Sequence, residues 1–403
     1  MAKVFVGMSG GVDSSVTAAL LKDQGHDVTG VFMKNWTRDI GGVVCPWRRD
    51  LADAKRVAVQ LDIPLKIFDF EKQYKHKVVD YMLDELERSR TPNPDVMCNQ
   101  EVKFKLFLNT ALEQGADMIA TGHYARLKPL AASPAGPAKP ATPRSSRLSA
   151  VSEPAVLTQR TNQYASLSSS AHSSVPSEPM PSRVRIGLHK GIDKNKDQSY
   201  FLYRVTEKAL SKTLMPIGEL RKPEVRRLAK QYGLATADKP DSQGICFVGE
   251  VSIDNFIREF IEVKSGVIIE RTSGRELGRH KGAPLYTVGQ RHGLGLGGGL
   301  PYYVIGTDVK TNTVTVTTDL DDESLWRDKF AMDDIRWVNG QPDWSKTYGV
   351  MVRYRSDPVP AKLSPAGDSV MVELAKETRA VTPGQSAVVY DGDTVLGGGI
   401  IQG

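Results

Sequence analysis

The sequence predicts an α/β protein of three parts: a parallel-sheet domain, a small central α+β domain and a C-terminal antiparallel β-barrel. In the first part, apolar runs of strand length alternate with segments of helical periodicity, as expected for parallel strands joined by helices. After residue 302 the pattern changes to alternating apolar and polar residues, with glycine, proline and aspartate between the runs. With 403 residues, the chain is long enough for two or three separate cores.

The first apolar strand leads directly into a glycine-rich turn and then a helix. Residues 4–8 form the apolar run, Gly10 and Gly11 permit a tight turn, and residues 14–21 have helical spacing. Such a turn collects backbone N–H groups and the positive end of a helix dipole at one point, where an anion is favoured. Asp13 adds a carboxylate that can hold Mg²⁺ or orient the loop. We therefore expect a phosphate-binding loop.

Later segments continue this alternation of strands and helices. Further strands are predicted at 28–33, 65–68 and 117–121, and helices at 50–61, 74–88, 101–114 and 219–232. The opening βαβ unit implies a parallel sheet, whose ligands bind at the carboxyl ends of the strands. Met33, Gly122 and His123 lie at such ends.

Two cysteines are expected in loops on the ligand side of this domain. Two prolines in Thr91-Pro-Asn-Pro-Asp95 predict a rigid loop, and the next helix is expected to begin just after Cys98. A helix N-terminus lowers the pKa of a nearby thiol. Cys246 follows a turn-forming run at 240–244, so the two cysteines suggest a thiol pair. Cys45 is expected to be structural.

The segment from Pro129 to Ser182 differs in composition from the rest of the chain. Alanine, serine and proline dominate it, and aromatic residues are nearly absent. Such a segment cannot bury enough apolar surface to offset its ordering entropy, so we expect disorder. Structured sequence resumes near Val184, which makes this segment an insertion. The expected parts are a first domain at 1–128 and 183–248, the insertion at 129–182, a central domain at 249–303 and a barrel at 304–403.

Composition limits the classes of function. The 53 Lys and Arg residues against 47 Asp and Glu give a net charge of +6, which is compatible with a nucleic-acid partner but does not establish one. Three cysteines without a CxxC pair argue against a disulfide scaffold, a structural zinc site and an iron–sulfur cluster. No apolar run approaches the ~20 residues of a membrane span. Because the first strand starts by Val4, we expect no signal or transit peptide, and a cytoplasmic enzyme.

The run Ser9-Gly-Gly-Val-Asp-Ser14 matches the SGGxDS signature of the ATP pyrophosphatase, or PP-loop, superfamily. Its members have a Rossmann-like fold of the adenine nucleotide alpha hydrolase type, grip the pyrophosphate of ATP, and attach AMP to a substrate oxygen. The chain has no GxxxxGK[ST] motif, which argues against a kinase or GTPase. The loop does not identify the substrate, because the enzymes that synthesise asparagine, GMP and argininosuccinate all use it.

The full set of motifs closely resembles the tRNA-uridine 2-sulfurtransferases, the MnmA/TRMU family, in its bacterial form. This family makes 2-thiouridine at the wobble position (34) of tRNAs for Lys, Glu and Gln. The resemblance covers everything except 129–182. It is carried by the motifs at 7–14, 32–36, 91–95 with Cys98 and Asn99, 120–126, 195–202, 244–247, 287–291 and 382–386.

The resemblance implies roles for individual residues. ATP is expected to contact Gly7, Met8, Ser9, Gly10, Gly11, Val12, Asp13, Ser14, Met33 and Gly122. The target base is expected to contact Asn93, Pro94 and Asp95. The tRNA is expected to contact His123, Lys196, Asp197, Gln198, Arg353, Tyr354 and Gln385. Cys98 resembles the nucleophile, Cys246 the persulfide carrier, and Asp95 is placed for proton transfer.

The implied chemistry agrees with these residue types. A uracil carbonyl oxygen is a poor leaving group, so AMP is attached first and diphosphate is released, with Mg²⁺ balancing the charge. Sulfur then comes from a persulfide on Cys246, supplied by a sulfur-relay protein or a cysteine desulfurase. Either Cys98 releases it as sulfide or its terminal sulfur attacks directly, and both routes end with a disulfide between the two cysteines.

Two other functions remain as alternatives. An amide-forming ligase of the GMP synthetase type uses the same loop, but it needs no pair of loop thiols, and the chain has no glutaminase half. The other alternative is a protein that has the same fold and binds tRNA but does not catalyse a reaction. The presence of Asp13, Cys98 and Cys246 argues against this second alternative.

Overall fold

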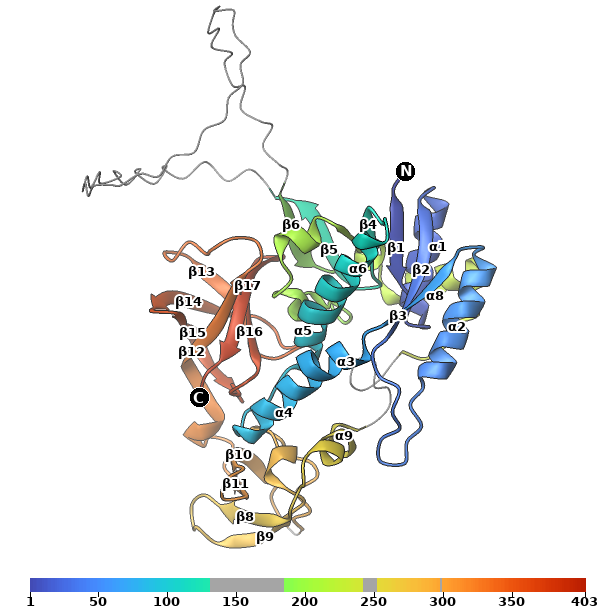
Figure 1. The fold of residues 1–403 in the computed structure, drawn as a ribbon. Coiled ribbons are helices and arrows are strands. Elements are labelled where there is room, and N and C mark those ends of the chain that lie inside the picture. The colour runs from blue at the N-terminus through green and yellow to red at the C-terminus, as the bar shows by residue number, and fades with distance from the viewer. Residues whose placement is uncertain (131–184, 242–251, 298) are drawn as a thin grey trace, which may run out of the picture. The chain divides into compact units, whose positions relative to one another are not determined.

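The computed structural model describes residues 1–130, 185–241, 252–297 and 299–403 (Figure 1). Most of the predicted insertion and residues 242–251, including Cys246 and most of the turn before it, lie outside the described residues. Within the described residues, no helix is long and apolar enough to cross a membrane.

The N-terminal domain is built on the predicted parallel sheet, which has a fifth strand, β7, in addition to the four that we expected. The strand order is β3-β2-β1-β4-β7, with β1 in the centre, and every pairing is parallel. The bounds are β1 (Lys3–Gly7), β2 (Asp27–Lys34), β3 (Leu65–Asp69), β4 (Met118–Ala120) and β7 (Thr213–Leu214). Val4, Phe5 and Val6 are fully buried, because helices cover both faces of a parallel sheet.

Helices pack on the two faces of this sheet and form two separate cores. One face, with Val4 and Val6 of β1, packs against α1, α2 and α8, which Figure 1 shows beside the strands. The other face, with Phe5, packs against the segments that include α4 and α5. The bounds are α1 (Val12–Asp23), α2 (Trp47–Gln60), α3 (Glu71–Tyr74), α4 (Asp80–Glu87), α5 (Pro94–Met97), α6 (Leu108–Glu113), α7 (Glu207–Leu210) and α8 (Lys222–Gln231), with π-helical turns at Lys75–Val79 and Cys98–Phe107.

The segment around Cys98 is helical, so the loop predicted there is wrong. Pro94 occupies the first turn of α5, where a missing backbone N–H costs nothing. The Asn93 side chain caps this helix by accepting a hydrogen bond from the Val96 N–H at 3.3 Å. The helix then continues through Cys98–Phe107 into α6. Cys98 therefore lies inside a helix rather than ahead of one.

The central domain contains α9 (Ile253–Phe260) and a four-stranded sheet of order β10-β11-β8-β9. Its strands are β8 (Gly266–Glu270), β9 (Glu276–His280), β10 (Tyr303–Asp308) and β11 (Thr313–Thr317). We expected β10 and β11 in the barrel, but β11 pairs in parallel with β8. The boundary expected at 303/304 therefore cuts through this sheet. Alternating polarity identifies a strand without identifying its partner.

The C-terminal domain is the predicted antiparallel barrel. Six strands follow the order β12-β15-β14-β13-β16-β17, and pairing of β12 with β17 closes them. Their bounds are β12 (Trp326–Trp337), β13 (Thr347–Met351), β14 (Val359–Ala366), β15 (Ser369–Arg379), β16 (Ser386–Asp391) and β17 (Thr394–Ile401). A hairpin of β5 (Ala125–Pro129) and β6 (Ile186–Lys190) extends the same sheet, since His189 pairs with Thr394.

The β5–β6 hairpin brings the two ends of the predicted insertion together. Pro129 lies opposite Ile186 in the antiparallel register. The Leu130 N–H donates to the Arg185 carbonyl at 2.8 Å, so residues 130 and 185 stand at the end of a ladder. A two-residue turn can therefore replace residues 131–184 without moving either strand.

We predict that replacing 131–184 with Asn-Gly leaves the remaining fold intact. The cost of closing a loop changes by only about 0.6 kcal/mol for each doubling of its length. The melting temperature in thermal unfolding should stay within a few degrees of wild type. A variant with a scrambled 131–184 of the same length is the control. Loss of cooperative unfolding in the deletion variant alone would show that the segment carries part of the fold.

Candidate active site

The turn between β1 and α1 has a conformation that depends on glycine. Gly10 has φ of +74°, and an added Cβ would overlap the backbone carbonyl of Asp50. Hydroxyl groups then hold the turn: the Ser15 Oγ donates to the Gly11 carbonyl at 2.8 Å, and the Ser14 Oγ donates to it at 3.1 Å. The turn is therefore a rigid strand-to-helix connection at the N-terminus of α1, which is the geometry that favours an anion.

The residues expected to bind ATP are brought together around this turn. Gly122 follows β4, and a Cβ there would lie 2.9 Å from the Asp13 carbonyl carbon and from the Ser14 nitrogen. A Cβ on Gly7 would lie 3.2 Å from Cε of Met33. The loop 7–14, Met33 and Gly122 thus form one contiguous group at the carboxyl edge of the sheet.

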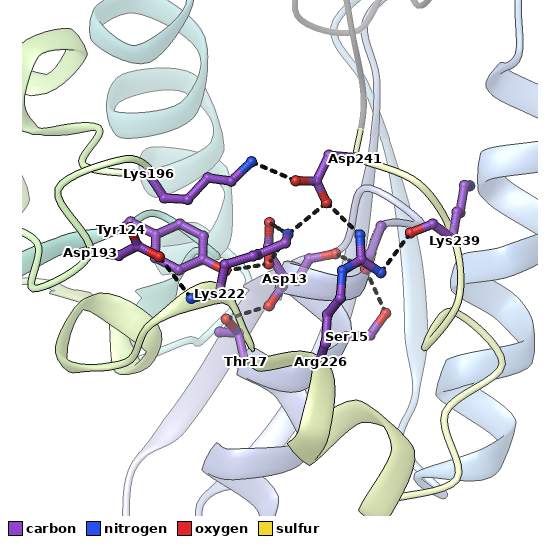
Figure 2. Close-up of polar contacts among 12 residues, drawn as sticks. Asp13, Ser15, Thr17, Tyr124, Asp193, Lys196, Lys222, Arg226, Lys239 and Asp241 are labelled. Atoms are coloured by element: carbon purple, nitrogen blue, oxygen red, sulfur yellow. Dashed lines mark hydrogen bonds and ion pairs between the residues drawn. The ribbon is translucent and has the colours of Figure 1, made fainter. Parts of the chain in front are cut away.

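Asp13 is the centre of the polar contacts shown in Figure 2. Its carboxylate accepts a hydrogen bond from the Tyr124 hydroxyl at 2.7 Å. The Lys222 ammonium, which comes from α8, donates to both of its oxygens at 2.8 and 2.9 Å. Burial, together with the negative charge of Asp13, raises the pKa of Tyr124, so this hydroxyl stays a donor. Lys222 is itself buried, and its pairing with Asp13 compensates for its loss of water.

Asp241 extends this network to three cations (Figure 2). It pairs with Lys196 at 2.6 Å and with Lys222 and Arg226 at 2.8 Å each. Burial alone would raise the pKa of Asp241, but hydrogen bonds from Lys196 and Lys222 outweigh burial and lower the pKa from 3.8 to about 2. Asp241 is therefore ionised throughout the physiological range, and it holds Lys222 against the loop.

Lys239 provides a second ammonium group at the loop. It donates to the Gly10 carbonyl at 3.0 Å and pairs with Asp50 at 2.7 Å and Asp53 at 2.6 Å. Our sequence analysis did not include Lys222 or Lys239 among the site residues. The available signals were the basic helix predicted at 219–232 and the position of Lys239 at the start of the turn that leads to Cys246. Neither signal reveals ion pairs between distant segments.

Asn35 is another residue that our site prediction missed. It lies directly after β2 at the carboxyl edge of the sheet and is 1% exposed. Within the part of the chain that the structure describes, neither its side-chain oxygen nor its nitrogen has a hydrogen-bond partner. Leaving a buried polar group unpaired costs about 1–3 kcal/mol. A ligand at this edge would satisfy the amide.

The residues expected to contact the target base lie together at the start of one helix. Asn93 caps α5, Pro94 and Asp95 form its first turn, and Cys98 follows three residues after Asp95, on the same face. Cys98 is fully buried in the core that also contains Phe107. Phe107 lies near the loop, since its ring is 3.5 Å from the Cβ position of Gly7. Cys246 lies outside the described residues.

Several side chains expected to contact tRNA are engaged within the protein. His123 is 7% exposed, and its Nδ1 is 2.9 Å from the Thr121 Oγ1. Burial lowers the pKa of His123 well below its usual value, so the ring is neutral. The Asp197 carboxylate accepts hydrogen bonds from the backbone of Gly191 and Ser199, and burial raises its pKa.

The remaining predicted tRNA contacts differ in exposure. The Gln198 Oε1 accepts from the Tyr124 N–H at 3.0 Å, and Lys196 pairs with Asp241. Tyr354 packs on Phe201 with ring centroids 4.4 Å apart. The Gln385 side chain donates to backbone carbonyls of residues 91 and 92. Arg353 is exposed.

We predict that Asp241→Asn destabilises the protein at pH 7 by about 1–2 kcal/mol. The folded pKa lies below the unfolded one, so the stabilisation is present above about pH 4 and is lost as the pH falls towards 2. Urea unfolding at pH 7 and pH 3 should show a smaller difference between variant and wild type at pH 3. Asp238→Asn is the control, because Asp238 is 87% exposed and its ion pair with Lys230, at 3.3 Å, lies at the surface. An equal effect of Asp241→Asn at both pH values would contradict a role for its charge.

Three family models match the chain in the order of its domains. The model described as tRNA methyl transferase HUP domain matches 2–141 and 161–250. The model described as tRNA methyl transferase PRC-barrel domain matches 254–318, and the aminomethyltransferase beta-barrel domain matches 327–401. The second match includes β10 and β11, in agreement with their pairing in the central sheet.

Curated relatives match over nearly the full chain. The tRNA-specific 2-thiouridylase MnmA of Geobacillus thermodenitrificans (strain NG80-2) is 41% identical over 99% of this chain and 94% of the relative. The MnmA of Pseudomonas syringae pv. syringae (strain B728a) is 40% identical over 100% of this chain and 94% of the relative. Among solved structures, the match to the NMN synthetase of Francisella tularensis covers 30% of this chain and 44% of the synthetase, with 16% sequence identity. Its TM-score is 0.22, which is too low to support a conclusion. From the matches to the family models and to the curated relatives, the chain belongs to the family of the tRNA-specific 2-thiouridylases MnmA.

Proposed function

We propose that this protein is a sulfurtransferase that uses ATP to convert the wobble uridine of tRNA, position 34, into 2-thiouridine. Its membership of the MnmA family supports the substrate and the product. The structural observation that supports the proposal is that the helical segment that begins with Cys98 reaches the end of β1, where the phosphate loop begins. Phe107 of that helix is 3.5 Å from the Cβ position of Gly7, at the end of β1.

The loop and its surroundings fit ATP as the activating substrate. The N-terminus of α1 favours phosphate, and Lys222 and Lys239 place two ammonium groups beside the turn. The unpaired Asn35 amide offers one donor and one acceptor at the same edge, which matches the hydrogen-bonding edge of a base. We assign the phosphates to the loop 7–14 and its two lysines, and the remainder of ATP to Met33, Asn35 and Gly122.

We assign Mg²⁺ to Asp13. In the described ranges, no three His, Cys, Asp or Glu side chains converge on one metal position. This fits Mg²⁺, which is held by one or two carboxylates together with phosphate oxygens. When bound, the ion neutralises charge on the diphosphate that leaves. Lys222, which now pairs with Asp13, would then be available to a phosphate oxygen.

The reaction then proceeds in two stages. The uracil O2 attacks the α-phosphorus of ATP, the bond to the diphosphate breaks, and Lys222 and Lys239 stabilise the charge of the diphosphate. Sulfur from a Cys246 persulfide next bonds to C2, and AMP leaves with the former O2. Either the Cys98 thiolate first attacks Sγ of Cys246 and releases sulfide, which then attacks C2, or the terminal sulfur of the persulfide attacks C2 directly and the Cys98 thiolate then attacks Sγ of Cys246, which breaks the sulfur–sulfur bond. In both cases a Cys98–Cys246 disulfide forms, and a thiol reductant must supply two electrons before the next cycle.

The finer assignments follow from the same proposal. We assign the sulfur supply to a relay protein or a cysteine desulfurase, the substrates to tRNAs for Lys, Glu and Gln, and the location to the cytoplasm. Asn93, Pro94 and Asp95 would contact the base, with Asp95 in proton transfer. Among the residues expected to contact tRNA, exposed Arg353 is available to a phosphate without rearrangement.

Analysis of the modified nucleoside tests the proposed function. The purified protein is incubated with unmodified tRNA, ATP, Mg²⁺, cysteine and a cysteine desulfurase, and the digested tRNA is examined by mass spectrometry. We expect 2-thiouridine at position 34, only when ATP is present. Two of the matching family models are described as methyl transferase domains, so a methylated nucleoside would contradict the proposal. Formation of 2-thiouridine without ATP would also contradict it.

We predict that Cys98→Ser and Cys246→Ser each abolish 2-thiouridine, and that they differ in persulfide loading. After incubation with the desulfurase, intact-mass analysis should find the sulfur adduct on Cys98→Ser and none on Cys246→Ser, because the persulfide forms on Cys246. Cys45→Ser is the matched control, because Cys45 is also buried and its Sγ donates to the Trp36 carbonyl at 3.6 Å, but it is expected to be structural. An adduct that persists on Cys246→Ser and vanishes on Cys98→Ser would reverse the two roles.

A further inference from the structure

We propose that the barrel turn, defined as residues 383–385, positions the segment that presents Asp95 and Cys98 to the target base. Gln385 is then a positioning residue that acts through the backbone of Thr91 and Pro92, rather than a residue whose main role is to contact tRNA. The inference rests on the proposed function, and it concerns how the C-terminal barrel takes part in the reaction.

Three hydrogen bonds join the barrel turn to this segment. The Gln385 Nε2 donates to the Thr91 carbonyl and to the Pro92 carbonyl, each at 3.0 Å. In the opposite direction, the Thr91 N–H donates to the Pro383 carbonyl at 2.9 Å. Both protons of the Gln385 amide are thus engaged by two successive carbonyls, which leaves this side chain little freedom to move alone.

Gly384 allows the two backbones to approach this closely. Its φ is +88°, a conformation that favours glycine, and an added Cβ would lie 2.8 Å from the Thr91 carbonyl oxygen and 2.9 Å from the Thr91 nitrogen. The contact is therefore a backbone-to-backbone junction rather than a meeting of flexible side chains. Even one methyl group at residue 384 would push the two segments apart.

The barrel holds the turn rigidly from the other side. The Gly384 N–H donates to the Ile401 carbonyl at 2.9 Å, and the Ile401 N–H donates to the Gln385 carbonyl at 2.8 Å. These bonds tie the turn to the last strand of the barrel, β17. A further hydrogen bond joins the chain just before Thr91 to the residue after β17: the Arg90 Nη1 donates to the Gln402 Oε1 at 3.0 Å.

The position of the turn is transmitted directly to the catalytic helix. Pro92 and Pro94 fix their own φ angles, so the chain between Thr91 and α5 is short and stiff. Asn93 caps the helix in which Asp95 and Cys98 follow. A shift of about 1 Å in a reacting group can cost about 100-fold in rate. A barrel that binds the tRNA body would thereby fix the position of the helix with Asp95 and Cys98 relative to the target base.

The test separates positioning from tRNA contact by comparing rates with affinities. For Gln385→Ala, single-turnover adenylation of tRNA at saturating ATP and tRNA should slow by at least about 10-fold, while the Kd for tRNA and the KM for ATP change less than about 2-fold. Gln385→Glu should be at least as slow, because a carboxylate cannot donate to the two carbonyls. Gln341→Ala, at an exposed glutamine of the same domain, is the control and should match wild type.

A second measurement needs no substrate and so does not depend on the proposed function. Amide hydrogen exchange in residues 91–98 should be faster in Gln385→Ala and Gly384→Ala than in wild type and Gln341→Ala. Gln385→Ala removes the donor to the Thr91 and Pro92 carbonyls, and Gly384→Ala pushes the turn away from Thr91, so in both variants the segment is held less firmly against the Pro383 carbonyl that accepts from the Thr91 N–H. Unchanged exchange in both variants would overturn the inference. A weaker tRNA Kd with an unchanged saturated rate would also overturn it and return Gln385 to a simple tRNA contact.

Discussion

The carboxylate of Asp13 connects the parts of the nucleotide site. It accepts hydrogen bonds from Tyr124 and Lys222, and Lys222 in turn pairs with Asp241. These contacts join the phosphate loop, the end of β4, α8 and the turn that leads to Cys246. Each ion is costly to bury alone, so the network is stable only as a set of pairs. Because the acids here are balanced by bases, the phosphates of ATP in the proposed reaction would meet ammonium groups that are already in place.

The second constraint acts on the base side of the site. The barrel turn holds Thr91 and Pro92, while Phe107 of the same continuous helix packs near Gly7 at the end of β1. The helix with Cys98 is thus held between the barrel and the nucleotide loop. This arrangement explains why the protein combines the two domains in one chain. In the proposed reaction, the first domain would bind and activate the substrates, and the barrel would fix where the base meets the catalytic helix.

Local patterns predicted the parallel sheet and the loop geometry at Gly10, because strand and turn signals there come from neighbouring residues. They did not predict the helix at Cys98, because proline suggested a loop although it also suits a first helical turn. Alternation identified β10 and β11 as strands but not their partner, β8. Lys222 was missed for a related reason: its ion pair with Asp13 joins residues 209 positions apart.

The proposed reaction depends most on AMP-forming cleavage of ATP at the Asp13 and Lys222 network. The direct measurement is the release of diphosphate and AMP from ATP after tRNA is added and before any sulfur donor is present. We predict tRNA-dependent diphosphate release by wild type and by Lys230→Met, whose lysine lies on the exposed side of α8, and a rate at least about 10-fold lower for Lys222→Met. Release of ADP and phosphate, or equal rates in both variants, would contradict the account.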